Sequence, residues 1–296
     1  MAENRSGLGF GWAATGFALI LVILTFSTIY IFAGRVWWFP EPANSFAEAI
    51  DKQFGRTLFI CGIVFLLAQL GLAYVILRYR DRGQRAHYSH GNNLLEILWT
   101  SAAIVLFLGM GIAAERAWAS LYFQGASQGA MQVEVTGQQF IWNFRYPGPD
   151  GVFGRTDPER IDERSNPLGL DETDPASQDD IYSQVMVVPV NREIEVILRS
   201  KDVTHSFFVR ELRFKQDTVP GMTIRLHFTV EKRGEYEIAC AELCGLGHYR
   251  MNTKLVVLPP GELDRILSSQ EELDNWSDER VFRQTAGSGR SPGGEN

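Results

Sequence analysis

The stretch Cys240-Ala-Glu-Leu-Cys244-Gly-Leu-Gly-His248-Tyr-Arg-Met251 contains two thiols, an imidazole and a thioether. Soft sulfur ligands together with imidazole suit copper, zinc or iron. In known copper electron-transfer centres, one Cys and two His bind the ion and a Met binds it weakly. This stretch has a second Cys, so we expect two copper ions bridged by two thiolates. The second imidazole must come from elsewhere, and His205, which follows a strand-like run, is the best candidate.

Two other uses of these residues compete with copper. Two Cys and two His are a common zinc set, but zinc sites close with four ligands and leave no role for the thioether of Met251. The usual zinc spacing also keeps the two His together, whereas His205 lies far upstream of His248. Catalysis by a Cys with a His is the second rival, and no carboxylate that would orient the imidazole is evident. The spacing therefore favours a copper pair.

Three stretches resemble, in their order, the signature of the dinuclear copper (CuA) domain of cytochrome c oxidase subunit II. They are Asp202-Val-Thr-His-Ser-Phe207, Lys215-Gln-Asp-Thr-Val-Pro-Gly221 and the stretch from Cys240 to Met251. The copper ligands that this resemblance implies are His205, Cys240, Glu242, Cys244, His248 and Met251. In that scheme the cysteines bridge the ions and each histidine binds one. Met251 binds one ion weakly, and Glu242 reaches the other through its main-chain carbonyl, while its carboxylate binds a Mg²⁺ shared with subunit I.

The composition restricts the class of protein. A net charge of -7 argues against a nucleic-acid binder and fits a basic partner. Of the three cysteines, Cys61 stands alone in an apolar run, where we expect a small buried hydrophobic side chain rather than a ligand. The sequence has no C-x-x-C-H motif for covalent haem attachment. We therefore expect no haem and no catalytic residue in this chain.

Three apolar runs are long enough to cross a bilayer as helices: Phe10–Ala33, Thr57–Leu77 and Leu94–Ala114. The first run could instead be a signal peptide, since Arg5 precedes it. It is longer than the usual apolar region of a signal peptide and ends in a poor cleavage site, so we favour a retained helix. The family that the chain resembles has two helices, which match the second and third runs, so the first helix is an addition.

An arginine cluster after the second run sets the predicted orientation. It consists of Arg78, Arg80, Arg82 and Arg85, opposed only by Asp81. Such a cluster marks the cytoplasmic side, so the N-terminus is expected inside and everything after about residue 115 outside. We expect a multi-pass protein of a bacterial inner membrane whose C-terminal domain lies in the periplasm.

Glu96 is a carboxylate near the inner end of the third run. An ionisable group within a spanning segment is by default a functional candidate, often for protons. The alternative is an interfacial carboxylate that merely reaches the headgroups, and the residue alone does not decide between the two. The resemblance favours the functional interpretation, because the corresponding Glu of the family lies at the mouth of a proton path into subunit I.

The remainder of the chain is predicted to be all-β. Alternation typical of strands occurs in residues 131–136, 181–190, 193–199, 223–230, 235–239 and 254–258. Many short strands indicate a Greek-key, cupredoxin-like domain after the transmembrane helices. An amphipathic helix is expected from Glu262 to about Asn275, followed by a disordered polar tail.

The fold class is therefore mixed, with four expected parts. They are residues 1–56, an additional transmembrane helix and interfacial loop; 57–120, a two-helix transmembrane hairpin; 121–268, the periplasmic copper domain; and 269–296, the polar tail.

An aromatic segment follows the first predicted strand. Aromatic side chains near a metal can receive an electron, but more commonly they pack a β-sandwich core. In the family this segment carries a Trp that takes the electron from cytochrome c. Phe140 stands at that position here and Trp142 keeps the second aromatic position, so both are candidates for electron input.

Residues 147–180 are rich in proline and acidic side chains, with ten Asp and Glu against three Arg. A charge run is usually a solvated loop. The functional alternative is an electrostatic docking surface for a basic redox partner, which would raise the association rate. Loops this long are often functional, so both interpretations stay open.

The resemblance implies subunit II of a haem–copper terminal oxidase. It would take electrons from a c-type cytochrome and pass them to haem in subunit I, where oxygen is reduced and protons are pumped. The expected partners are subunit I, subunit III, the cytochrome and the lipid membrane. The alternatives are the copper-bearing electron-input subunit of a membrane nitric oxide reductase and a metal-free quinol oxidase relative, against which the complete ligand set argues. Soluble nitrous oxide reductases share the copper motif and are excluded by the three spanning runs.

Overall fold

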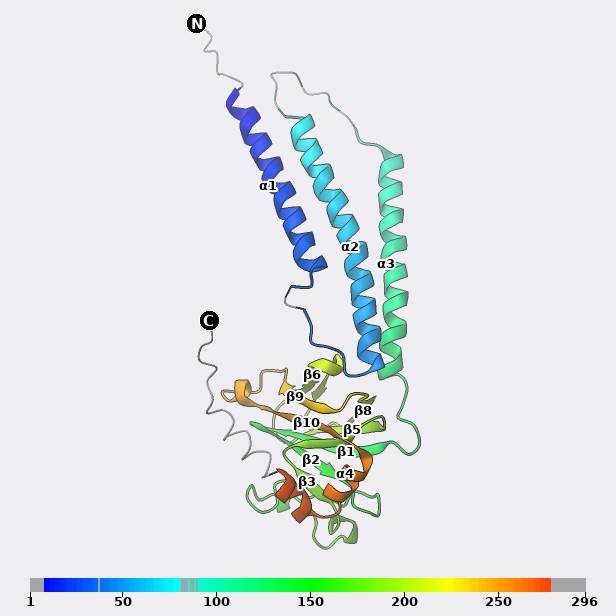
Figure 1. Cartoon of the computed structure of the whole chain (residues 1–296), viewed down its shortest axis with the longest axis vertical. Helices are drawn as coiled ribbons and strands as arrows, with labels where there is room; N and C mark the ends of the chain where they lie inside the picture. The colour runs from blue at the N-terminus through cyan, green and yellow to red at the C-terminus, as the bar shows by residue number, and fades with distance from the viewer. Residues whose placement is uncertain (1–7, 37, 81–84, 86–87, 89, 278–296) are drawn as a thin grey trace, which may run out of the picture. The chain divides into compact units, whose positions relative to one another are not determined.

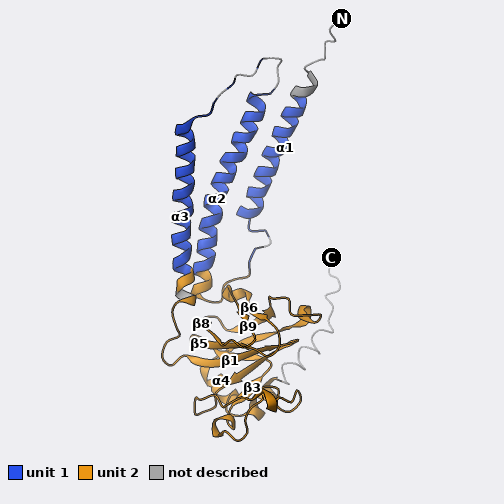
Figure 2. Ribbon diagram, turned by 180° about the vertical axis from the view of Figure 1, so that it is seen from behind, with its two compact units in different colours: residues 1–39, 49–117 blue, residues 40–48, 118–296 orange. Residues whose placement is uncertain are grey.

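The computed structural model describes residues 8–36, 38–80, 85, 88 and 90–277. The chain divides into two compact units, which Figure 2 colours separately. One unit comprises residues 1–39 and 49–117, and the other comprises residues 40–48 and 118–296. The first unit is helical and the second is built mainly from β-strands.

The helical elements are α1 (Leu8–Ala33), α2 (Ser45–Arg78) and α3 (Asn93–Tyr122). In the part of the chain that the structure describes, these three helices are long and apolar enough to cross a membrane. Helix α2 begins well before the predicted Thr57, because the side-chain oxygen of Asn44 accepts a hydrogen bond from the amide of Ala47 at 2.8 Å and caps the helix.

The residues that follow α2 are described in part. Arg78 ends the helix, and Arg80 and Arg85 follow it. Arg82 and Asp81 of the predicted cytoplasmic cluster lie outside the described residues. The predicted disordered tail also lies outside them from residue 278 onward.

The β unit consists of two five-stranded sheets (Figure 1). The first sheet contains β1 (Met131–Gln138), β2 (Ile141–Tyr146), β3 (Ile181–Ser183), β5 (Glu193–Ser200) and β8 (Ile224–Thr229). The second contains β4 (Met186–Pro189), β6 (His205–Val209), β7 (Phe214–Thr218), β9 (Gly234–Cys240) and β10 (Asn252–Leu258). The sheet orders are β3-β2-β1-β5-β8 and β4-β10-β9-β6-β7.

Both parallel and antiparallel pairs occur within these sheets. β1 runs parallel to β5 and β4 runs parallel to β10, while the other neighbouring pairs are antiparallel. Strands far apart in sequence are therefore neighbours, as in Greek-key sandwiches. Three apolar helices followed by this two-sheet unit confirm the predicted fold class.

The hydrophobic core of the β unit lies between the two sheets. Alternate residues of each strand point inward, so the apolar positions of both sheets meet. The largest fully buried side chains in this core include Trp142, Phe144, Phe207, Ile238 and Leu255. Each large apolar side chain buried in this way contributes about 1.5–3 kcal/mol relative to an exposed one. The same core includes Cys240, Cys244 and Met251, so the candidate ligands are part of the packed interior.

Several predicted elements differ from the structure. The predicted strand 181–190 is two strands, β3 and β4, which lie in different sheets because the chain crosses between the sheets at residues 184 and 185. β6 and β7 were not predicted as strands. The predicted C-terminal helix is also two segments, α4 (Pro260–Ile266) and a further helical segment at residues 270–277, separated by a turn.

The segment before α2 belongs to the β unit. Ala43 is buried, its amide donates to the carbonyl of Glu211 at 2.9 Å, and its carbonyl accepts from the amide of Glu231 at 3.0 Å. Residues 40–48 are held to the β unit by these main-chain bonds. From the sequence, the same residues were grouped with the first helix.

The acidic segment, residues 147–180, covers the outer face of β2. Arg145 points away from the core, yet it is only 2% exposed because this segment packs over it. Its guanidinium donates to Glu134 of β1 at 2.8–3.0 Å, to Asp180 at 2.9 Å and to the carbonyl of Gly154 at 2.9 Å. A buried arginine between two carboxylates therefore joins the segment to the sheet.

Arg145→Met is expected to destabilise the β unit by about 3–5 kcal/mol, because Asp180 would remain buried without its cation and Glu134 would keep only the partly exposed Arg199 as its partner. The measurement is urea denaturation of the detergent-solubilised chain, followed by near-ultraviolet circular dichroism. Arg155→Met is the matched control, because Arg155 is 72% exposed and its ion pairs with Asp171 and Asp174 contribute about 1 kcal/mol or less. Equal effects of the two substitutions would contradict the structural role of Arg145.

Candidate metal centre

The candidate ligands come from two adjacent strands and one loop. His205 is the first residue of β6, and Cys240 is the last residue of the neighbouring strand β9. Residues 240–251, which we call the ligand loop, then supply Cys244, His248 and Met251. The amide of Cys240 donates to the carbonyl of Met251 at 3.0 Å and closes the loop at its base. The sheet register thus brings His205 to the start of the ligand loop.

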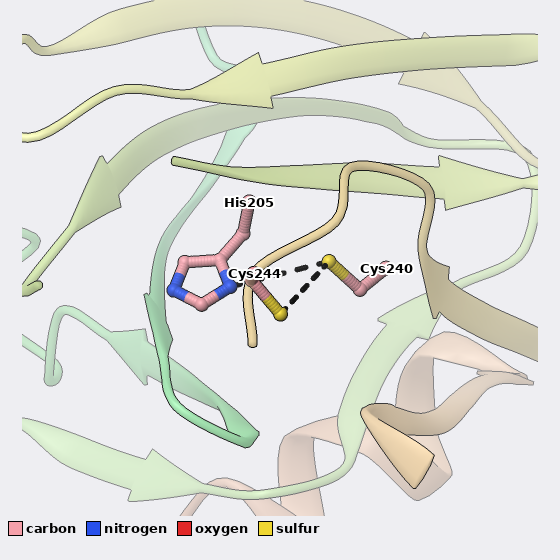
Figure 3. Close-up of side chains that lie close together, drawn as sticks. All are labelled: His205, Cys240 and Cys244. Atoms are coloured by element: carbon pink, nitrogen blue, oxygen red, sulfur yellow. Dashed lines mark hydrogen bonds between the residues drawn. The ribbon is translucent and has the colours of Figure 1, made fainter. Parts of the chain in front are cut away.

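His205, Cys240 and Cys244 form the centre of the site (Figure 3). All three are buried, and their ligand atoms lie within 4.8 Å of one another. The two sulfur atoms are 3.9 Å apart, and Nδ1 of His205 lies 4.0 Å from the sulfur of Cys240. Figure 3 shows the imidazole and both sulfurs directed into the same space.

The other predicted ligands surround this group. Nδ1 of His248 lies 3.6 Å from the sulfur of Cys244, and the buried thioether of Met251 lies 3.7 Å from that sulfur. The carbonyl oxygen of Glu242 lies 3.2 Å from the sulfur of Cys240. Each thiol therefore has one imidazole and one weaker donor beside it. Glu242 is an exposed residue, although its main-chain carbonyl lies beside the buried sulfur of Cys240.

The two thiols differ in their protonation. Burial raises the pKa of Cys240, but hydrogen bonds with His205 and the neighbouring main chain outweigh burial and lower this pKa to about 6. Burial and the adjacent Cys240 raise the pKa of Cys244 to about 11. Any proton on either sulfur must leave when a metal binds both of them.

Asp202 and Gln139 support the ligands from behind, and sequence reasoning did not identify either role. Asp202 accepts from Nε2 of His205 at 2.8 Å and from the amide of Gln139 at 2.7 Å. The Gln139 side chain donates to the carbonyl of Cys244 at 2.5 Å. A carboxylate on the far nitrogen of a metal-binding imidazole fixes its orientation and leaves Nδ1 for the metal. The sequence signal was the Asp three residues before His205, within a stretch already recognised as part of the site.

These contacts also set the pKa values of the pair. Burial lowers the pKa of His205, but its contacts with Cys240 and Asp202 raise it by more, so the net shift is upward. The pKa of Asp202 is lowered on balance, because hydrogen bonds from Gln139 and His205 outweigh the effect of burial.

Two glycines make room for the site. A Cβ atom at Gly137 would lie 2.9 Å from Cδ2 of His205, and one at Gly247 would lie 2.4 Å from the ring of Phe140. β1 can therefore approach His205, and the ligand loop can lie against Phe140, only because neither glycine has a side chain. The absence of a side chain at Gly137 is therefore required for the position of the His205 imidazole.

The two predicted electron-input residues occupy different environments. Trp142 is 1% exposed, and its ring contacts those of His205 and Phe207 edge-on, with centroids 6.0 and 5.7 Å apart. Phe140 is half-buried beneath the ligand loop, and the guanidinium of Arg250 lies 5.9 Å from its ring centroid. Trp142 is thus a core residue that touches a ligand, whereas Phe140 lies at the edge of the site.

Glu96 lies in the helical unit, in the first turn of α3. The side chain of Asn92 caps this helix by accepting from the amides of Leu94 and Leu95 at 3.0 and 3.2 Å. The proton-path role of Glu96 stays a prediction. Cys61 lies on α2 in the helical unit, and in this chain it is exposed and not buried as predicted.

The donor set fits a pair of soft metal ions that share two sulfurs. Two thiols lie between two imidazoles, with a thioether and a carbonyl completing the set, and the whole group is anchored at the end of a rigid sheet. Structural zinc uses four strong ligands and has no use for the buried thioether of Met251. Thiolate, imidazole and a weak thioether are the ligands of copper electron-transfer sites.

Comparisons with known proteins identify relatives of both units. Residues 131–258 match the family described as cytochrome c oxidase subunit II, periplasmic domain. Residues 33–113 match the family described as cytochrome c oxidase subunit II, transmembrane domain. The two matches together cover more than half of the chain, and they agree with the family predicted from the sequence.

Individual relatives carry the same description. The alternative cytochrome c oxidase subunit 2 of Bradyrhizobium diazoefficiens is 34% identical over 268 residues, which cover 88% of this chain and 94% of that protein. The cytochrome c oxidase subunit 2 of Cereibacter sphaeroides is 29% identical over 231 residues, covering 72% of this chain and 73% of that protein. Among solved structures, the periplasmic domain of cytochrome oxidase subunit II from Bradyrhizobium japonicum is 27% identical, covers 48% of this chain and 94% of that chain, and gives a TM-score of 0.35.

Gly137→Ala is expected to displace the His205 imidazole and to reduce copper retention, because the new methyl group would overlap the ring. Overpacking of this kind costs about 1–3 kcal/mol. The measurement is the copper content of the purified chain after dialysis against a weak chelator. Gly125→Ala is the matched control, since a Cβ there meets no atom within 4 Å. Full copper retention by Gly137→Ala would show that the close approach of β1 is not required.

Proposed function

Because the chain belongs to the cytochrome c oxidase subunit II family, we propose that it is the electron-input subunit of a haem–copper terminal oxidase. The observation that supports this most strongly is the convergence at the end of β9 of two buried thiols, the buried imidazole of His205 and the buried thioether of Met251, with the partly buried His248 beside them. Single electrons arrive from a c-type cytochrome and leave for haem in subunit I, where oxygen is reduced and protons are pumped. The family match favours this oxidase over the nitric oxide reductase alternative.

The chain's own residues hold the cofactor. Bound here, a pair of copper ions supplies one-electron transfer with little change in its bonds. Cys240 and Cys244 would bridge the two ions, His205 and His248 would each bind one, and Met251 and the carbonyl of Glu242 would complete the set. Asp202 holds the His205 ring in place, and the packed core keeps water from the sulfurs. A site that is rigid before and after electron transfer needs little reorganisation.

The partners and the location follow from the family and the charge pattern. The three apolar helices make this a membrane protein. The arginines after α2 favour the cytoplasmic side for their end of the helix, which supports a β unit in the periplasm of a bacterium with an inner membrane. Subunits I and III are the membrane partners, Glu96 lies at the entrance of a proton path, and the Glu242 carboxylate holds a Mg²⁺ with subunit I.

Cys244→Ser is expected to abolish the copper pair, because one bridging sulfur is lost. Copper should fall from about two ions per chain to one or none, and the thiolate-to-copper absorption bands should disappear. The measurement is metal analysis with visible spectroscopy on the purified full-length chain. Cys61→Ser removes a thiol far from the site in sequence and serves as the matched control. Unchanged copper content and spectrum in Cys244→Ser would contradict the bridge assignment.

Neutralising exposed charges of the acidic segment is expected to weaken binding of a basic c-type cytochrome and to reduce the salt dependence of that binding. Glu159→Gln combined with Glu172→Gln removes two exposed charges. The measurement is the Kd at several ionic strengths. Asp264→Asn with Glu271→Gln changes the net charge equally in the C-terminal helical region and serves as the control. A flat salt dependence in the unsubstituted chain would leave the segment as a solvated loop.

A further inference from the structure

Lys201 has a hydrogen-bond acceptor for each of its three ammonium donors. Its Nζ donates to Glu163 at 2.6 Å, to the side-chain oxygen of Gln138 at 3.1 Å and to the carbonyl of Pro167 at 3.2 Å. A lysine ammonium has three donors, so none is left over here. The side chain is only 16% exposed, whereas lysine side chains in proteins are mostly exposed. Lys201 is therefore held in one position between the first sheet and the acidic segment.

A further hydrogen bond closes this group of residues. The side-chain nitrogen of Gln138 donates to the other carboxylate oxygen of Glu163 at 2.6 Å, so Lys201, Gln138 and Glu163 bind one another pairwise. Hydrogen bonds from Lys201 and Gln138 lower the pKa of Glu163, and its carboxylate is therefore ionised at neutral pH. An ion pair that belongs to such a network fixes its residues better than an isolated surface pair does.

The main chain of Lys201 leads directly to the His205 side of the metal site. The next residue is Asp202, which accepts from Nε2 of His205 at 2.8 Å. The amide of Lys201 donates to the carbonyl of Gly137 at 3.0 Å, and Gly137 is the residue that makes room for the same imidazole. The position of Lys201 therefore influences two of the residues that surround His205.

The main chain of Gln138 leads in the same way to the Cys244 side of the site. The next residue is Gln139, whose side chain donates to the carbonyl of Cys244 at 2.5 Å and whose amide donates to Asp202 at 2.7 Å. Successive side chains of an extended chain point to opposite sides. Gln138 accordingly contacts the acidic segment, while Gln139 contacts the ligand loop. Two short pieces of chain thus connect the acidic segment to the residues that support the ligands.

We propose that Lys201 is a positioning residue for the copper centre, through which the acidic segment helps to keep His205 and Cys244 in place. This inference rests on the proposed function, because it concerns the copper pair. Lys201 acts on the ligands through Asp202 and Gln139. The acidic segment thereby gains a task that differs from both interpretations of its charge, the solvated loop and the docking surface.

The rival explanation is that Lys201 acts on the copper centre only through its charge. A nearby cation repels copper ions, and a nearby anion attracts them. On charge alone, removing the ammonium of Lys201 should therefore slow the release of copper, and removing the charge of Glu163 should speed it. If the contact between Lys201 and Glu163 positions the ligands, both substitutions should speed the release. The two explanations thus differ in the sign of the effect at Lys201.

The test measures the rate at which the purified, copper-loaded, full-length chain releases copper to an excess of a chelator. Lys201→Met and Glu163→Gln should each speed this release by about threefold to tenfold, which is less than the loss of a direct partner of a ligand costs. Lys254→Met is the matched control, because Lys254 forms an ion pair of the same 2.6 Å length with Glu235 in the second sheet. The control should release copper at the rate of the unsubstituted chain.

Two further readouts separate displaced ligands from a loss of folding. The Lys201→Met chain should keep the near-ultraviolet circular dichroism of the unsubstituted chain, while the copper hyperfine splitting in its electron paramagnetic resonance spectrum should change. The double variant, Lys201→Met with Glu163→Gln, should release copper about as fast as Lys201→Met alone. Both substitutions remove the same contact, so their effects should not multiply.

Slower or unchanged copper release from Lys201→Met, or effects that multiply in the double variant, would overturn the inference and leave the proposed function intact. If Lys201→Met fails to fold, Glu163→Gln decides the question, because the Glu163 side chain is 59% exposed and its substitution is milder. Unchanged release from Glu163→Gln would then overturn the inference. If the unsubstituted chain binds no copper pair, the proposed function itself fails.

Discussion

The hydrogen bond from the amide of Cys240 to the carbonyl of Met251 closes the ligand loop, and all the candidate ligands except His205 lie between these two residues. Because Cys240 and the residue after Met251 belong to paired strands, the position of the loop is set by the register of β9 and β10. His205 enters from β6, the other neighbour of β9. Sheet pairing therefore fixes the two ends of the loop and the position of His205.

The residues that support the ligand loop are also positioned by the sheets. Gly137 lets β1 approach the His205 ring, and the turn after β1 carries Gln139, which reaches the carbonyl of Cys244. Asp202 connects these two parts by bonding to both His205 and Gln139. Both sheets thus contribute to holding the two sulfurs 3.9 Å apart in the interior. A site held so firmly suits a carrier that must gain and lose an electron without moving its ligands.

The sequence predicts the parts of this architecture that depend on local composition. Long apolar runs predict the helices that are long enough to cross a membrane, and the spacing of Cys240, Cys244, His248 and Met251 predicts the candidate ligand set. β6 and β7 were not predicted, because polar residues such as His205 and Asp217 interrupt the alternation of apolar side chains that indicates a strand. The split of residues 181–190 between two sheets depends on tertiary pairing, which no local pattern records. Asp202 and Gly137 act through neighbours distant in the sequence.

The central claim is that this chain holds two coppers that share one unpaired electron. The direct measurement is electron paramagnetic resonance on the purified, copper-loaded, full-length chain, with the copper content of the same sample determined. The account predicts hyperfine splitting from two equivalent copper nuclei. A spectrum from a single copper, or a silent sample that contains zinc, would contradict it.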